Sequence, residues 1–270
     1  MGEDDGEEKS QVRAWVAWLR AGGTPETTIA LRRYYVRRLE RDHRDVLALD
    51  ADTLAAWLGA NGWAPNTLKS ARAALRSFYG WARHMGLRED SPAHLLPTVR
   101  VPRARPRPTP EAAYRAAQMQ AGARERLAID LAGRCGMRRG EIARVRVEDV
   151  EGDLAGRSLR VTGKGGHVRL VPLPHDLAET ILEHGTGWVF PSPRGGHLTP
   201  HHLSKAVSRL LPDGVTMHSL RHRCATRAYA ATRDLRAVQE LLGHSRPETT
   251  ATYVLAPDDA VRAAMSAAAA

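Results

Sequence analysis

The chain has 270 residues, of which 43% are hydrophobic and 26% are charged, a balance typical of folded globular domains. Two cysteines are too few for a disulfide scaffold or a cysteine-rich zinc site, and no apolar run approaches the ~18 residues that span a membrane. The net charge is +10, although residues 1–10 carry −4; the remaining +14 favours binding to nucleic acid, in the cytoplasm and at the nucleoid.

The N-terminal part of the chain predicts an acidic tail and then a small helical domain. Residues 1–10 are expected to be disordered, and residues 11–96 contain four stretches in which apolar residues recur every three or four positions. They predict helices over about 11–21, 25–42, 53–60 and 67–85. The second is expected to have Pro25 in its first turn, and the third to be capped by Asp52 or Thr53.

Residues 97–108 are of a different kind, because they combine four prolines and four arginines without an acid. Proline at this density cannot continue a helix and favours an extended chain. The segment is therefore predicted to be a linker between two domains. Its arginines, Arg103 and Arg105 among them, suit a stretch that crosses a phosphate backbone.

Residues 109–270 predict a second domain with more helix than strand. Helices are expected over about 110–120, 123–134 and 200–211, and residues 158–173 predict a β-hairpin. In that hairpin Leu159 and Val161 alternate, as do Val168, Leu170 and, less strictly, Pro172. Its turn is Gly-rich and contains Lys164. Residues 188–191 are a candidate for a short third strand, so the fold class is mainly α with a small antiparallel β-sheet.

The C-terminal third contains the polar residues best suited to chemistry. His218 and Arg221 are three apart on a predicted helix and share a face. A second helix, over 234–242, is expected to end at Gly243 in a left-handed conformation. His244 then falls in a loop, and an S-x-x-E capping box starts a third helix that contains Tyr253. Such a set could hold a phosphate between cations while a phenol attacks it.

These motifs resemble the tyrosine recombinases of the phage-integrase family. The matching features are H-x-x-R at 218–221, L-G-H at 242–244 and a tyrosine nine residues after that histidine. Residues 136–141, GMRRGE, resemble the family's G-[LM]-R-x-G-E box, and Lys164 matches its hairpin lysine. His167 departs from the pattern, where Lys, Arg or Thr is more usual. The resemblance implies an N-terminal helical core-binding (SAM-like) domain over 11–96 and an α+β catalytic domain over 109–270.

The resemblance also implies a site-specific DNA recombinase that cleaves and rejoins DNA through a 3′-phosphotyrosine. It needs no metal, ATP or other cofactor, and it works as a tetramer on double-stranded recombination sites. By analogy, the start of the fourth helix enters a DNA groove through Thr67, Lys69 and Arg72. The implied catalytic set is Arg138, Lys164, His218, Arg221, His244 and Tyr253, the last being the nucleophile.

Two other functions and several other residue roles stay open at this point. The chain could be a catalytically silent DNA-binding accessory protein on the same fold, or a tyrosine-type DNA topoisomerase. Tyr229 and Cys224 are interpreted as interior residues rather than nucleophiles. His222, four residues after His218, could pair with it on a metal, although the family carries the same run without one. The Ala-rich tail over 258–270 is a candidate for a short C-terminal helix, which could pack in cis, pack in trans or fray.

Overall fold

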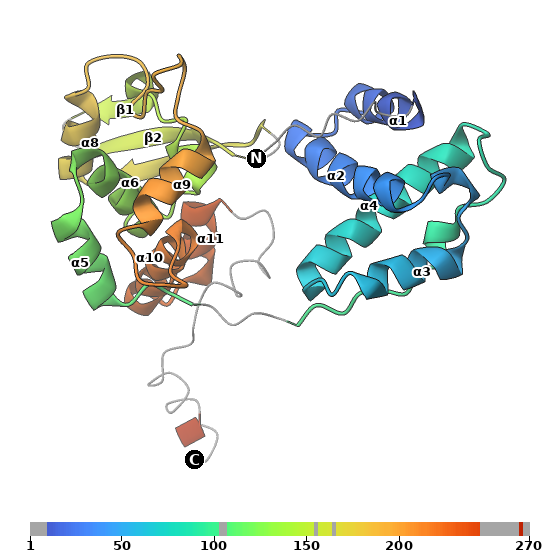
Figure 1. The fold of residues 1–270 in the computed structure, drawn as a ribbon. Helices are drawn as coiled ribbons and strands as arrows, with labels where there is room; N and C mark the ends of the chain where they lie inside the picture. The colour runs from blue at the N-terminus through green and yellow to red at the C-terminus, as the bar shows by residue number, and fades with distance from the viewer. Residues whose placement is uncertain (1–9, 103–106, 154–155, 164–165, 244–264, 267–270) are drawn as a thin grey trace. The chain divides into compact units, whose positions relative to one another are not determined.

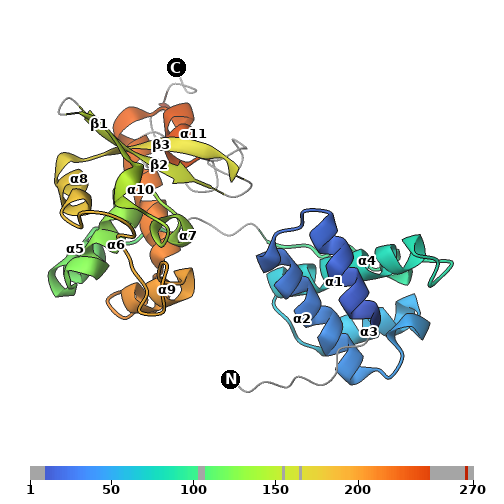
Figure 2. The same cartoon turned by 90° about the horizontal axis from the view of Figure 1, so that it is seen from above.

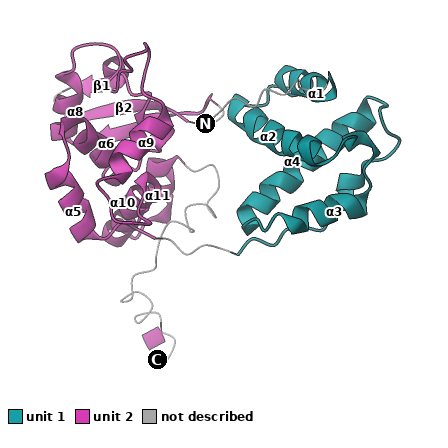
Figure 3. Cartoon of the chain, viewed as in Figure 1, with its two compact units in different colours: residues 1–103 teal, residues 104–270 magenta. Residues whose placement is uncertain are grey.

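A computed structural model of the chain describes residues 10–102, 107–153, 156–163, 166–243 and 265–266. The chain divides into two compact units, residues 1–103 and 104–270, and the division falls within the predicted linker (Figure 3). Each unit has a hydrophobic core of its own, so each is described by itself.

The described part of unit 1 is helical. It contains α1 (Ser10–Ala21), α2 (Glu26–Asp42), α3 (Ala51–Ala60) and α4 (Pro65–His84), with short 3-10 turns at Val46–Ala48 and Pro92–His94 (Figure 1). Helix α4 packs along α2, and α1 packs on α2. Aromatic rings fill this core: Trp15 meets Phe78 edge to face at a centroid distance of 5.4 Å. The buried Tyr79 hydroxyl donates to the Val46 carbonyl, so its burial leaves no unsatisfied donor.

The helix starts in unit 1 differ from the sequence prediction by one to three residues. Pro25 precedes α2 with an extended ψ of 138° and is not part of its first turn. Asp50, rather than Asp52 or Thr53, caps α3, because its carboxylate accepts the Thr53 main-chain amide at 2.8 Å. Only the residue directly before the helix has a side chain that reaches the free amide of its third residue.

The helices of unit 2 surround one central helix, α6 (Ala123–Gly133), in which every residue from Leu127 to Gly133 is buried. In the described part of this unit, the named helices are α5 (Glu111–Gln120), α6, α7 (Arg139–Ile142), α8 (His175–Leu182), α9 (Pro200–Ser208), α10 (Met217–Thr232) and α11 (Leu235–Leu242) (Figure 2). Helix α6 packs most extensively against α10, and it also contacts α5, α7, α8 and α9. The predicted end of α11 is confirmed, since Gly243 follows it with φ +64°; the helix starts at Leu235, one residue later than predicted, with Asp234 as its cap.

A three-stranded antiparallel sheet completes unit 2 in the order β1 (Val150–Asp153), β2 (Gly156–Thr162) and β3 (Val168–Leu173). The predicted hairpin is confirmed, with Leu159 opposite Val171 and Thr162 opposite Val168. The candidate third strand was wrong: the third strand is β1, preceded by a 3-10 turn over Val147–Asp149, whereas Trp188 and Pro191 form isolated bridges. The mainly helical fold class with a small antiparallel sheet is confirmed.

The two faces of β3 are also reversed relative to the alternation read from the sequence. Val168 and Leu170 are 60% and 55% exposed, whereas Val171 and Leu173 are buried. Because side chains alternate along a strand, Arg169 shares the inner face with Val171. A charged side chain on an inner face needs a partner of opposite charge, and the partner of Arg169 is Glu141.

Candidate active site

Three of the six predicted catalytic residues lie in the described part of unit 2. Arg138 directly precedes α7, and His218 and Arg221 lie in the first two turns of α10. Lys164, His244 and Tyr253 lie outside the described residues, as does the helix predicted to start at Ser245.

The Arg138 side chain is held by a buried carboxylate. Glu141 is 4% exposed at its side chain, and its Oε1 accepts from Nη1 of Arg138 at 2.7 Å. Its Oε2 accepts the main-chain amide of Arg138 at 2.9 Å. Helix α7 is only four residues long, so the guanidinium, rather than a helix dipole, supplies most of the positive charge here.

Arg169 is the second cation on the same carboxylate, and the sequence reading did not single it out. Its Nη1 and Nη2 donate to Oε1 and Oε2 of Glu141 at 3.0 and 2.8 Å, in the bidentate geometry that arginine favours. Burial alone would raise the pKa of the Glu141 carboxyl. The hydrogen bonds from Arg169 and from the Arg138 amide outweigh burial and lower that pKa to about 2.

Arg221 is buried and connects three segments of unit 2. It is 1% exposed, its Nη1 donates to the Gly136 carbonyl, and its Nη2 donates to the Leu242 carbonyl at 2.8 Å. Gly136 lies two residues before Arg138, and Leu242 is the last residue of α11. The guanidinium therefore holds α10 against both the Arg138 loop and the end of α11.

His218 lies among these arginines. Burial lowers the pKa of its imidazole, and the positive charges of Arg221, Arg138 and Arg139 lower it further. The ring is therefore neutral at pH 7 and can accept a hydrogen bond or a proton. It contacts the His222 ring edge to face at 4.7 Å. Within the described ranges, no group of three or more potential ligands that could hold a metal includes this pair.

Two glycines that directly precede predicted catalytic residues in the sequence lie at this cluster. A Cβ built on Gly163, the residue before Lys164, would lie 3.7 Å from Oε1 of Glu141 and 3.8 Å from Nη1 of Arg169. A Cβ built on Gly243, the residue before His244, would lie 2.6 Å from Cδ of Arg169. Nη2 of Arg138 also points to the Gly243 carbonyl, at 3.4 Å.

Other potential nucleophiles in the described part of unit 2 are poorly suited to attack. Cys135 and Cys224 are both buried and unbridged, and burial raises the pKa of their thiols to about 12 and about 11. The phenol of Tyr114 donates to Asp130, and burial followed by that carboxylate raises its pKa. Tyr229 is half-buried and packs against the small core around Ala225. The interior interpretation of Cys224 is thereby confirmed.

The DNA-contact candidates have mixed surroundings. On α4, Lys69 is exposed and Thr67 is half-buried. Arg72 is half-buried, and its Nε and Nη2 donate to the Leu96 carbonyl at 3.3 and 2.8 Å, so part of its guanidinium fastens the segment after α4. Arg103 and Arg105 lie outside the described residues.

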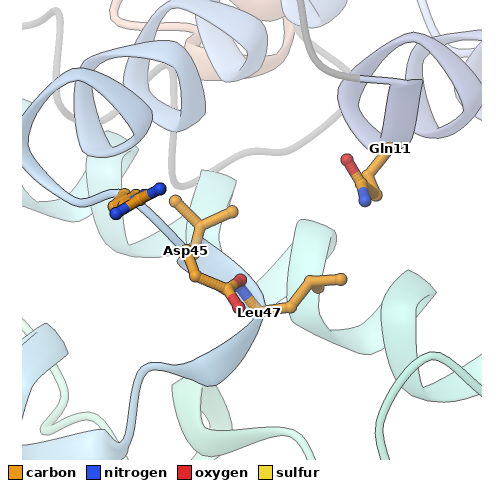
Figure 4. Close-up of a pocket in the computed structure, with 5 residues that line it drawn as sticks. Gln11, Asp45 and Leu47 are labelled. Carbon is orange, nitrogen blue, oxygen red and sulfur yellow. The ribbon is translucent and has the colours of Figure 1, made fainter.

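The surface hollows differ in how they relate to this cluster. A hollow of about 380 Å³ in unit 1 contains none of the candidate residues; Figure 4 shows Gln11 facing Asp45 and Leu47 across it. The Asp45 carboxylate accepts the Leu47 amide at 3.0 Å and so serves a turn. In unit 2, a hollow of about 230 Å³ is lined in part by Glu141 and Gly163 and therefore borders the cluster.

Residues 111–259, more than half of the chain, match the model of the phage integrase family. The chain belongs to the phage integrase family. Two relatives, both named tyrosine recombinase XerC, extend the likeness. The protein from Chromobacterium violaceum is 30% identical over 266 residues, which are 90% of this chain and 88% of the relative. The protein from Rhodospirillum centenum is 32% identical over 235 residues, which are 77% of this chain and 68% of the relative.

The family membership makes the chain a tyrosine site-specific recombinase, an enzyme that binds DNA and transfers its strands. These matches favour neither a topoisomerase nor a silent accessory protein. The solved structure of a lambda integrase dimer bound to a COC′ core site has a TM-score of 0.73, with 21% identity, covering 90% of this chain and 76% of that chain. It shows that this recombinase has the integrase fold. Among the helices of the described ranges, none has the length and apolar character to cross a membrane.

Proposed function

We propose that this recombinase exchanges DNA strands through a covalent bond between Tyr253 and a DNA 3′-phosphate, with neither metal nor nucleotide cofactor. The observation that supports this most is the cluster in unit 2. It brings Arg138, Arg221 and a neutral His218 together, next to the glycines that precede Lys164 and His244. Phosphoryl transfer depends mainly on positioning and on stabilising the charge of the phosphate oxygens, and arginine forks supply both.

In the proposed reaction, the Tyr253 phenol oxygen attacks the scissile phosphorus, and the bond from phosphorus to the 5′-oxygen breaks. His218 accepts the phenol proton, directly or by relay, since its lowered pKa keeps it unprotonated. Lys164 gives a proton to the leaving 5′-oxygen, and His244 donates to a non-bridging oxygen. The products are a 3′-phosphotyrosine and a free 5′-hydroxyl. Attack by a 5′-hydroxyl of the other duplex reverses these steps and joins the exchanged strands.

We further propose that four subunits assemble on two recombination sites, because each subunit has one Tyr253 and complete exchange requires cleavage of four strands. Both units contribute to binding: unit 1 through the start of α4, at Thr67, Lys69 and Arg72, and the linker through Arg103 and Arg105. The +14 charge of the chain beyond residue 10 supports contact with the phosphate backbone in both places.

The decisive experiment first recovers the natural site and then tests the nucleophile. DNA that is bound to the recombinase in cells would be recovered and sequenced, and the site would be rebuilt as a nicked duplex that loses its short 5′-hydroxyl fragment on cleavage. We expect the wild type to accumulate a protein–DNA adduct resistant to denaturant. Tyr253→Phe should form none, because the attacking oxygen is gone.

Tyr229→Phe is the matched control, because Tyr229 is the half-buried tyrosine of α10. This variant should form the adduct as the wild type does. An adduct from Tyr253→Phe would assign the nucleophile elsewhere. A wild-type protein that binds the recovered site without forming an adduct would contradict the covalent mechanism altogether.

A further inference from the structure

Arg169 occupies a central place in the cluster, although it is not one of the six predicted catalytic residues. It lies in β3, opposite Val161 of β2, and its side chain is 14% exposed. Its inner-face position puts it between two segments that are distant in sequence: α7, which follows Arg138, and the end of α11, which precedes His244.

On the α7 side, Arg169 and Arg138 share one carboxylate. The two oxygens of Glu141 receive four hydrogen bonds: two from the Arg169 guanidinium, one from the Arg138 guanidinium and one from the Arg138 amide. All the lone-pair positions that a carboxylate offers are thereby in use. Glu141 cannot turn without breaking several of these bonds, so the bidentate contact from Arg169 fixes the carboxylate that orients Arg138.

The charges of the three groups add a second consequence. Glu141 and Arg138 alone would form a neutral pair, and a neutralised guanidinium attracts a phosphate less strongly. With Arg169 the three groups together carry two positive charges and one negative charge, and the side chains of Glu141 and Arg169 are shielded from solvent. The excess positive charge remains available to a phosphate that approaches Arg138, whose side chain is 39% exposed.

On the α11 side, Arg169 lies against the backbone of Gly243. A Cβ at that residue would come within 2.6 Å of Cδ, 2.9 Å of Nε and 3.0 Å of Nη1 of Arg169. An added Cβ would have to displace the Arg169 side chain, and the φ of +64° at Gly243 independently favours glycine. The Arg169 stem therefore limits where the end of α11 can lie, and with it the point from which the chain continues to His244.

We propose that Arg169 is a positioning residue for strand cleavage. It holds the Glu141 carboxylate and the end of α11, so that Arg138 is oriented toward the scissile phosphate and its positive charge is not neutralised by Glu141. This inference rests on the proposed covalent mechanism. The alternative is that Arg169 only stabilises the fold. Arg157 of β2, which pairs with Glu179 on α8, is an arginine with such a structural role and serves for comparison. Arg157 is similarly shielded, at 22% exposure of its side chain, and contacts no residue of the cluster in its described ion pair.

The test uses the full-length recombinase on the nicked duplex that carries its recovered site. Single-turnover cleavage would be followed for wild type, Arg169→Gln, Arg169→Lys and the control Arg157→Gln, with DNA affinity and melting temperature measured separately. We expect Arg169→Gln to lower the cleavage rate constant of the bound complex about 10- to 100-fold, the loss typical of a misplaced catalytic group, while DNA affinity stays close to that of the wild type. Arg169→Lys keeps the charge without the bidentate contact and should recover part of the rate.

Two outcomes would overturn the inference. One is an Arg169→Gln protein whose folded fraction cleaves at the wild-type rate constant. The other is an equal loss of rate constant in Arg157→Gln, which would reduce the effect to sheet stability. Either result, obtained while the wild type still forms the Tyr253 adduct, rejects the role of Arg169 and leaves the covalent mechanism in place.

A second pair of variants tests the α11 contact without changing Arg169. Gly243→Ala adds a methyl group against Arg169, whereas Gly196→Ala makes the same change at φ +68° with nothing within 4 Å. Both carry the strain of a left-handed alanine, but only the first displaces Arg169. We expect Gly243→Ala alone to lower the cleavage rate constant. Equal rate constants for the two variants would contradict the proposed contact.

Discussion

Glu141 shows how a single residue sets the electrostatics of this site. Its carboxylate is buried, which by itself is unfavourable, yet its pKa is about 2 because arginine and amide donors stabilise the charged form. For His218, burial comes first and the positive charges of Arg221, Arg138 and Arg139 add to it; both lower the pKa of the imidazole and favour its neutral form. One cluster therefore holds a permanent anion, several permanent cations and an uncharged base. This combination suits a reaction in which a phosphate must be bound and a phenol must lose its proton.

The lowered pKa of His218 predicts how stability depends on pH. A histidine in the unfolded chain has a pKa of about 6.5. Between that value and the lower pKa of folded His218, the unfolded chain binds more protons, so the free energy of unfolding falls as pH falls below about 6.5. We expect His218→Gln to lose less stability than the wild type between pH 7.5 and 5.5, as measured by denaturant unfolding.

His201→Gln, which replaces an exposed histidine of α9, serves as the control and should keep the wild-type pH dependence. If His218→Gln also kept it, the imidazole would not titrate differently in the two states, and its assignment as a neutral base would lose its support.

At the residue scale, the sequence could nominate candidates but not show how they meet. Motif spacing pointed to Arg138, His218 and Arg221 because each lies in a recognisable local pattern. Arg169 has no such pattern: it stands between Val168 and Leu170, whose apolar character suggested the inner face. Only the register of the hairpin and the position of buried Glu141 place Arg169 inside, and both depend on contacts between segments far apart in the chain.

At the scale of elements, α11 is a short helix whose C-terminal end contributes directly to the site. Its eight residues bury only Val238 and Leu242, which form a small core with Ala225. Yet its C-terminal end supplies the carbonyls of Leu242 and Gly243 to Arg221 and Arg138. A helix this short is marginal on its own and buries little, so its N-terminal cap adds a useful part of its stability. The cap at the start of α11 therefore helps to keep its C-terminal carbonyls in place.

This dependence predicts the effect of removing the cap of α11. Oδ1 of Asp234 accepts the amides of Arg236 and Ala237 at 2.8 and 3.0 Å. Asp234→Ala should destabilise the helix by about 1 kcal/mol, which corresponds to roughly fivefold faster hydrogen exchange at the amides of α11. Cleavage should also slow, since both arginines lose firmly placed acceptors.

Thr199→Ala removes an equivalent cap from α9, where the side chain accepts the His202 amide. It should speed exchange in α9 and leave α11 and the cleavage rate unchanged. Unaltered exchange in α11 after Asp234→Ala would show that packing, not the cap, maintains this helix.

Most elements could be predicted from the sequence because their signals are local. Apolar periodicity predicted most of the described helices but not α8 (His175–Leu182), and the Gly-rich turn predicted the hairpin. The first strand, Val150–Asp153, was missed because four residues containing two acids and a glycine have no strand pattern. It pairs with β2 only because the chain returns beside Leu159. The predicted cap of α3 also differed from the observed one, because several polar residues near the start of that helix could act as its cap.

At the scale of the whole molecule, each of the two units has a large hydrophobic core of its own. The core of unit 1 is centred on aromatic residues of α1 and α4, and that of unit 2 on α6 and the sheet. In a recombinase, separate cores would let one unit grip the duplex while the other carries out the chemistry. Composition and the Arg–Pro segment indicated such a division, but only the two contact clusters define which residues belong to each unit.

Separate cores predict that damage to one unit spares the other. Leu75 of α4 and Leu131 of α6 are both fully buried, so truncating either to alanine should cost about 2–5 kcal/mol. Leu75→Ala should accelerate hydrogen exchange in α1–α4 and weaken binding to the recovered site, while the amides of α6 and α10 stay protected. Leu131→Ala should give the reciprocal pattern. Because the two variants are controls for each other, equal acceleration in both units from either one would mean that the chain unfolds as a single cooperative body, and the proposed division of labour would then lack its physical basis.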